Sequence, residues 1–211
     1  LDSALARVSI ENWDEQIVLD TYVRVTEPVT DYRTFISGIQ EEHVTSDTAM
    51  PLEHVQNLVA GILRGKILIG HGLENDLKVL CLDHPWTDIR DTAKYAPFMT
   101  RVHTSSVLKL VDAPELRPRK LKDLAYEKLG MDIQVIGQPH SPLEDAMAAM
   151  ALYKSVRPEW EKELAKAVSQ SYEEPISYPG TGQVRISNQC SLLPTVQHKQ
   201  YPLHVQNHQH I

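Results

Sequence analysis

The segment His140-Ser141-Pro142-Leu143-Glu144-Asp145 combines a helix start with two reactive side chains. Ser141 followed three residues later by Glu144 forms a capping box, and Pro142 stands at the first helical position, where its missing N–H costs nothing. His140 then lies just before the helix and Asp145 lies in its first turn, at positions whose side chains meet. Such a pair can position a metal ion and deprotonate a water molecule. It can also be a surface helix cap with two solvated polar residues, and the segment alone leaves both interpretations open.

The composition fits a globular protein. A chain of 211 residues with 42% hydrophobic residues can bury a core in one domain plus an appendage. Cys81 and Cys190 lie far apart, which predicts neither a disulfide framework nor a zinc site. No apolar run reaches membrane-spanning length, so we expect no membrane partner. The net charge of −7 argues against binding nucleic acid through bulk positive charge, but a nuclease can offset its acidic ligands with divalent cations.

Apolar periodicity predicts strands that alternate with helices, which indicates an α/β sheet. The predicted strands are a hairpin over residues 5–10 and 17–25 and two short strands at 66–69 and 88–92. The predicted helices are 52–63, a helix from residue 73, one at 121–129 that Gly130 stops, and one from Pro142 to about Val156. The last of these should end before Pro158.

The C-terminal residues differ in composition from the rest. Residues 168–211 are rich in Gln, Ser, Pro and His and contain two basic and two acidic residues. This composition predicts a disordered tail, with residues 1–167 as the folded domain. The tail contains four histidines that could bind metal adventitiously, but low-complexity drift of the sequence explains them better. They are His198, His204, His208 and His210.

Asp76 is a second candidate acid, because it lies in the first turn of the helix after strand 66–69. The helix dipole favours an acid there, yet the carboxyl ends of strands are also where α/β sheets bind ligands. Together with Asp145 and His140 it makes a candidate divalent-metal site, since Mg²⁺ prefers a few carboxylates plus water and phosphate oxygens. A two-metal centre needs further ligands to hold its ions about 4 Å apart.

Six stretches, in order along residues 1 to about 157, resemble one known family. They are Ala4–Ile10, Thr26–Thr34, Ser37–Ile39, Gly70–Leu77, Asp88–Thr92 and His140–Ala146. The chain resembles the DEDDh group of 3′–5′ exonucleases, and within it the branch of RNA exonuclease 4 and the interferon-stimulated exonuclease. The resemblance implies an RNase H-like fold, with a mixed central sheet flanked by helices.

The same resemblance implies a catalytic role for three residues. Two Mg²⁺ or Mn²⁺ ions would be held by four acids, among them Asp76 and Asp145, and His140 would be the general base. The substrate would be the 3′ end of single-stranded RNA, with DNA left open, and the products nucleoside 5′-monophosphates. The family also implies ribosomal RNA processing in the nucleus or nucleolus.

The family's first motif, an Asp-x-Glu pair on the first strand, is missing from the chain. Asp2 falls in the loop after that strand, and Glu11 reads as a solvated hairpin residue, so two of the four acids are absent. The first strand should lie between strands 5–10 and 66–69, so we expect a gap with two unpaired edges. An N-terminally incomplete chain, inactive as given, is the favoured interpretation. The alternative is a non-catalytic nucleic-acid-binding or scaffold protein that kept the fold.

Candidate substrate contacts each have a structural alternative. His71 and Asn75 could orient Asp76 or the terminal nucleotide, or serve only the helix entry. Arg119 and Lys120, in a basic cluster with Arg117 and Lys122, could contact phosphate or form a solvated basic face. Asp91 ends a strand near the expected site, where a turn explains it better.

Overall fold

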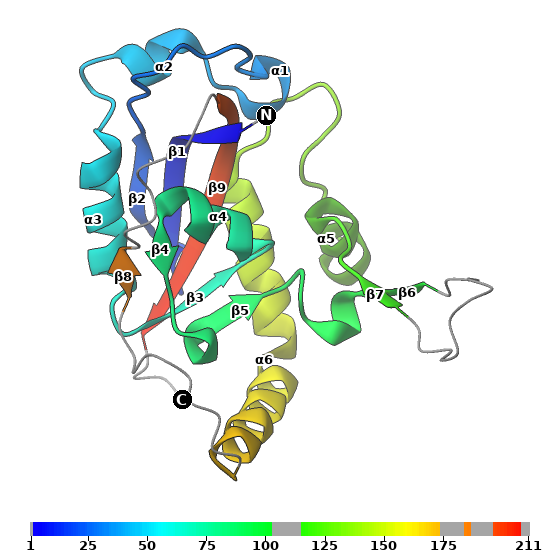
Figure 1. Ribbon diagram of the computed structural model, residues 1–211. Coiled ribbons are helices and arrows are strands. Elements are labelled where there is room, and N and C mark those ends of the chain that lie inside the picture. Colours follow the sequence, from blue (N-terminus) through cyan, green and yellow to red (C-terminus); the bar gives the residue numbers. More distant parts are fainter. Residues whose placement is uncertain (1, 103–114, 174–183, 187–195, 208–211) are drawn as a thin grey trace, which may run out of the picture.

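A five-stranded mixed sheet forms the centre of the molecule (Figure 1). The computed structural model describes residues 2–102, 115–173, 184–186 and 196–207. The strand order is β2-β1-β9-β3-β5. The antiparallel hairpin of β1 (Asp2–Asn12) and β2 (Ile17–Tyr22) is confirmed, and β3 (Lys66–Gly70) runs parallel to β5 (Ile89–Asp91). The sheet confirms the predicted α/β class.

Helices cover both faces of this sheet. Successive side chains of β3 point to opposite faces. Leu68 packs in one cluster with side chains of α3 (Leu52–Leu63) and α4 (Leu73–Leu80). Ile67 and Ile69 pack on the other face against α6 (Pro142–Glu173), and α5 (Leu121–Leu129) packs on α6 in turn. The predicted helices at 52–63 and 121–129 are confirmed, including the C-terminal Gly130.

Short elements complete the described chain. Two short helices follow the hairpin, and two small two-stranded sheets flank the main one. They are α1 (Thr34–Ser37), α2 (Glu41–Thr45), the pair β4 (Leu82–Asp83) and β8 (Arg185–Ile186), and the pair β6 (Thr100–Val102) and β7 (Glu115–Arg117). Two 3₁₀ turns, Trp86–Asp88 and Ala96–Phe98, flank β5.

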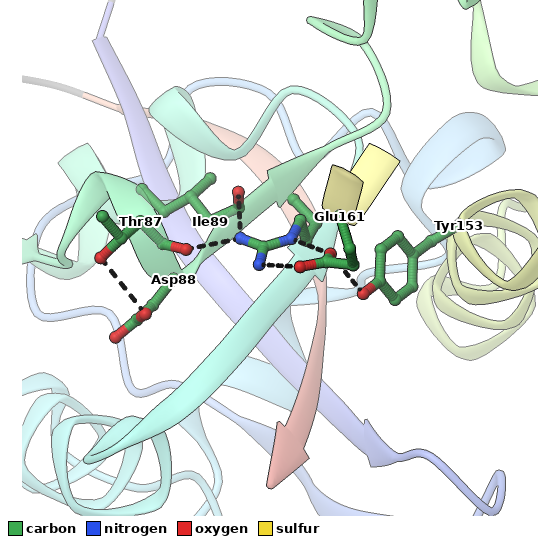
Figure 2. Close-up of polar contacts among 6 residues, drawn as sticks. Thr87, Asp88, Ile89, Tyr153 and Glu161 are labelled. Atoms are coloured by element: carbon green, nitrogen blue, oxygen red, sulfur yellow. Dashed lines mark hydrogen bonds and ion pairs between the residues drawn. The ribbon is translucent and has the colours of Figure 1, made fainter. Parts of the chain in front are cut away.

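α6 continues past Pro158, so its predicted end before this residue is wrong. A proline inside a helix costs about 3 kcal/mol, which tertiary contacts have to offset. The Arg90 guanidinium donates to both carboxylate oxygens of Glu161 at 2.6 and 2.8 Å, and the Tyr153 hydroxyl donates to the same carboxylate at 2.7 Å (Figure 2). This network ties the second half of α6 to β5.

β9 (Val196–Asn207) lies between β1 and β3, where the resemblance implies a gap (Figure 1). It runs parallel to β1 and antiparallel to β3. The prediction of two unpaired edges is therefore wrong, and the segment predicted as a disordered tail contributes a strand. The unpaired N–H and C=O groups of an edge strand can pair with another extended segment. In the sequence of β9, apolar residues alternate with other residues at Tyr201, Leu203 and Val205, as is typical of a strand.

The structure also bears on the cysteines and on the predicted domain boundary. Cys81 is disulfide-bonded, so the expectation of no disulfide is wrong, while Cys190 lies outside the described residues. α6 runs across the predicted domain boundary at residue 167, and that boundary stays a prediction. Among the described residues, no helix has the length and apolar character to cross a membrane. The tail histidines lie outside the residues whose side chains are described.

Candidate active site

A tight turn, Gly70-His71-Gly72, connects β3 to α4 and places Asp76 in the first turn of α4. A Cβ at Gly70 would lie 2.5 Å from Cδ2 of Leu73, so the buried leucine would have to move. Gly72 has φ 80°, a left-handed conformation that glycine adopts without steric cost. Asp76 is 4% exposed, so this candidate acid is buried at the start of α4, close to where β3 ends.

Asp91 caps the N-terminus of α4 from the neighbouring strand β5. Its carboxylate accepts hydrogen bonds from the backbone N–H groups of Gly72 at 2.7 Å, Leu73 at 3.1 Å and Ala93 at 3.0 Å. The residue preceding α4 provides no side-chain cap, so Asp91 satisfies N–H groups that the helix start leaves unpaired. The interpretation of Asp91 as a turn residue therefore holds, and the cap makes it an organiser of the turn that carries Asp76.

His71 has both ring nitrogens engaged in structural contacts. Its Nε2 lies 2.9 Å from the Arg119 carbonyl oxygen and its Nδ1 lies 2.9 Å from the Thr92 hydroxyl. Burial lowers the pKa of His71, although Asp91 and the Arg119 carbonyl oppose this effect. A carbonyl can only accept, so Nε2–H donates to the Arg119 carbonyl oxygen, while the one hydroxyl proton of Thr92 is donated to the Gly70 carbonyl at 2.9 Å. These contacts favour the helix-entry role over substrate binding.

The predicted helix start at residue 142 is confirmed. α6 begins at Pro142, and the Ser141 hydroxyl accepts the backbone N–H of Glu144 at 3.4 Å, which is one half of the predicted capping box. The His140 backbone N–H donates to the Ile36 carbonyl at 2.7 Å. This bond fixes the residue before the helix against α1.

Asp145 is a buried acid in the first turn of α6, 9% exposed. Burial raises the pKa of Asp145 above its ordinary value, and Glu144 adds to this effect. A hydrogen bond from Gln134 and the charge of His140 act in the opposite direction. Direct contact between the side chains of His140 and Asp145 stays a prediction.

Gln134 is a site residue that sequence reasoning missed. Its Nε2–H donates to Oδ1 of Asp145 at 2.9 Å from the loop between α5 and α6. Its backbone has φ 53°, in the left-handed region. An isolated glutamine in a loop carries no sequence signal for either property, because the turn that aims it at Asp145 is made only in the folded chain.

The remaining predicted substrate residues are accessible to different degrees. Asn75 and Lys120 are exposed. The Arg119 guanidinium is ion-paired with Glu127, and both residues line a cavity of about 670 Å³ beside α5. The same cavity is lined by the acidic side chains of Asp123 and Asp132, and by the cationic side chain of Lys122. Two cations against three acids give this cavity no positive potential for phosphate, so phosphate contact by Arg119 and Lys120 stays a prediction.

The described residues do not complete a two-metal centre. Asp76 and Asp145 are carboxylates, the ligand type that Mg²⁺ and Mn²⁺ prefer. Across the described ranges, however, no group of three or more His, Cys, Asp and Glu side chains could hold a metal ion. The candidate residues are therefore two buried acids and a histidine that the described structure does not gather into one metal-binding group, where the resemblance implies four acids.

Comparison with family models identifies the domain that carries these residues. The family model described as "Exonuclease" matches residues 3–153, from β1 to the first half of α6. The chain belongs to the exonuclease family. The matched range contains Asp76, Asp91, His140 and Asp145, so the turn after β3 and the start of α6 are both parts of this exonuclease domain.

Similar proteins include RNA exonuclease 4 of two organisms. The chain is 48% identical over 160 residues to RNA exonuclease 4 of Homo sapiens, and 42% identical over 163 residues to that of Mycosarcoma maydis. The matches cover 76% and 77% of this chain but only 34% and 40% of those proteins. The exonuclease domain described here thus corresponds to less than half of either relative.

Solved structures show the same fold. A Saccharomyces cerevisiae Pan2 pseudoubiquitin hydrolase-RNA exonuclease module in complex with AAGGAA RNA matches with a TM-score of 0.51 and 30% identity, over 75% of this chain and 24% of that one. The Neurospora crassa Pan2 catalytic unit matches with a TM-score of 0.52 and 22% identity, over 77% and 25%. These matches, with the mixed sheet, confirm the predicted exonuclease fold.

Proposed function

We propose that this chain is the exonuclease domain of an enzyme that shortens single-stranded RNA from its 3′ end and releases nucleoside 5′-monophosphates. The observation that carries the proposal is the exonuclease match over residues 3–153, together with 42% and 48% identity to proteins named RNA exonuclease 4. The RNA in the Pan2 complex supports RNA as the substrate class. A role in ribosomal RNA processing in the nucleus is part of this proposal and rests on the family resemblance.

In this proposal His140 is the general base and accepts a proton from the attacking water. The bond from its backbone N–H to the Ile36 carbonyl supports that role, because it fixes this residue at the start of α6, the helix that carries Asp145. Asp76 and Asp145 would contribute carboxylates to Mg²⁺ or Mn²⁺. A complete centre needs acids beyond those that the described residues bring together.

The test is a trimming assay on 3′-labelled single-stranded RNA in Mg²⁺ or Mn²⁺. We expect the full-length gene product to release labelled mononucleotide and its His140→Ala variant to lose this activity. The 211-residue chain alone should release little, because it brings together too few metal-binding acids. Strong trimming by this chain, abolished by His140→Ala, would show that its residues complete the site after all. A full-length product without nuclease activity contradicts the proposal.

A non-catalytic nucleic-acid-binding or scaffold protein is the second candidate. The incomplete ligand set among the described residues favours it. The two proposals differ in one measurement, because the scaffold would retain labelled RNA in a binding assay and return it at full length after incubation with Mg²⁺.

A further inference from the structure

The carboxylate of Asp145 receives its described side-chain hydrogen bond from outside its own helix. Asp145 stands on α6, whereas Gln134 belongs to the loop that precedes this helix, eleven residues earlier. The distance of 2.9 Å from Nε2 to Oδ1 is that of a well-formed N–H···O bond. Asp145 is buried and Gln134 is half-buried, so water competes little for this contact.

The backbone at Gln134 is unusual for its residue type. A φ of 53° lies in the left-handed region, which side chains with a Cβ enter at an energetic cost. The same loop has a second left-handed position at φ 85°, and there the residue is Gly137. A glycine at 134 would relax the backbone but could not reach Asp145. The contact between the two side chains is a physical reason for a glutamine at this position.

The chemistry of the amide suits an acid that has to stay charged. A lysine or arginine at 134 would form an ion pair with Asp145 and cancel the negative charge that a cation needs. The amide of glutamine carries no net charge and donates to one carboxylate oxygen. It therefore restrains the orientation of the acid and leaves its charge in place.

We propose that Gln134 is a positioning residue, whose Nε2–H···Oδ1 bond holds the Asp145 carboxylate in one orientation at the active site. The functional importance of that orientation rests on the role proposed above for Asp145. The hydrogen bond from Gln134 restrains the Asp145 carboxylate whether or not Asp145 has that role. Hydrogen-bond partners behind metal-binding or catalytic groups commonly change activity about ten-fold or more when they are removed.

The first experiment measures the side-chain rotamer of Asp145 by NMR in the 211-residue chain, through three-bond couplings from Cγ to backbone N and C′. Gln134→Leu removes the donor at similar volume, and Gln134→Gly removes it while relaxing the backbone. We expect one χ1 rotamer in the wild type and averaged couplings in both variants. Gln138→Leu, an exposed residue of the same loop, is the matched control. A single Asp145 rotamer retained in both Gln134 variants overturns the proposal.

The second experiment measures RNA trimming by the full-length gene product. Gln134→Leu should lower kcat by about ten-fold or more with KM within about two-fold, while Gln138→Leu changes neither. If Asp145→Ala leaves trimming intact, the proposed role of Asp145 fails, and the rotamer measurement still decides whether Gln134 restrains it. If Asp145→Ala abolishes trimming while Gln134→Leu leaves kcat unchanged, the positioning role is wrong.

Discussion

Asp91 links two elements through a single carboxylate, which accepts N–H groups at the start of α4 and at the end of β5. We expect Asp91→Ala to lower the free energy of unfolding by about 1–3 kcal/mol, because it leaves buried N–H groups without acceptors. Asp91→Asn keeps one acceptor oxygen and should lose less. Urea denaturation measures both changes. Equal midpoints for Asp91→Ala and the wild type would mean that the cap contributes nothing.

Glu11 on β1 should make stability depend on pH. It is 1% exposed, its Oε2 has no hydrogen-bond partner among the described residues, and burial raises its pKa to about 7. The charge of Glu15 adds to this shift and Lys154 opposes it. The folded state therefore binds the proton more tightly than the unfolded chain, whose ordinary value is 4.5. The free energy of unfolding should fall as pH rises from 4.5 to about 7 and level off above it.

Glu11→Gln tests this pH dependence. The variant should be more stable than the wild type at pH 8 by about 1–3 kcal/mol, and its stability should lose the decline between pH 4.5 and 7. Urea unfolding at several pH values measures it, with the exposed Glu27→Gln as the control for loss of one charge. Parallel pH profiles for Glu11→Gln and the wild type would show that Glu11 titrates normally. The sequence predicts a solvated hairpin residue here, because the burial of Glu11 depends on tertiary packing that a short stretch of sequence does not show.

At the scale of elements, the ion pair of Arg90 and Glu161 joins β5 to the part of α6 that follows Pro158. Arg90 is 2% exposed, and besides Glu161 it donates to the backbone carbonyls of Thr87 and Ile89 (Figure 2). Glu161→Ala leaves the buried guanidinium without its anion and should cost about 3 kcal/mol. Thermal denaturation measures this loss, and amide hydrogen exchange should quicken after Pro158. Glu163→Ala, an exposed acid on the same helix, should change neither.

The predictable elements are those whose evidence is local. The helix at 52–63, the hairpin, and the cap at 141–144 follow from periodicity and residue type within a few positions. Beyond Pro158, α6 is bound by Arg90, which lies 71 residues before Glu161. Gln134 is hidden for the same reason, because its backbone conformation and its contact with Asp145 exist only after the loop folds onto α6. Contacts between residues far apart in the chain cannot be predicted from a short stretch of sequence.

At the scale of the whole molecule, the central position of the sheet is filled from the far end of the chain. A strand joined to β1 by a tight hairpin would run antiparallel to β1. β9 instead runs parallel to β1 and antiparallel to β3. It also contains Pro202, which has no N–H to give to a ladder. The composition of this segment predicts disorder because polar residues dominate it. It forms a strand by pairing with the edges of β1 and β3, which the composition does not reveal.

Removing β9 should therefore destabilise the whole sheet. A chain that stops after residue 195 leaves the facing edges of β1 and β3 without partners. We expect its melting temperature to fall by about 5–10 °C and soluble aggregates to form, since unpaired edges associate with one another. Thermal denaturation and light scattering after size exclusion measure both effects, and a chain that stops after residue 207 is the control that keeps β9. If the shorter chain stays monomeric and melts with the control, the pairing of β9 with the central strands does not stabilise the fold in solution.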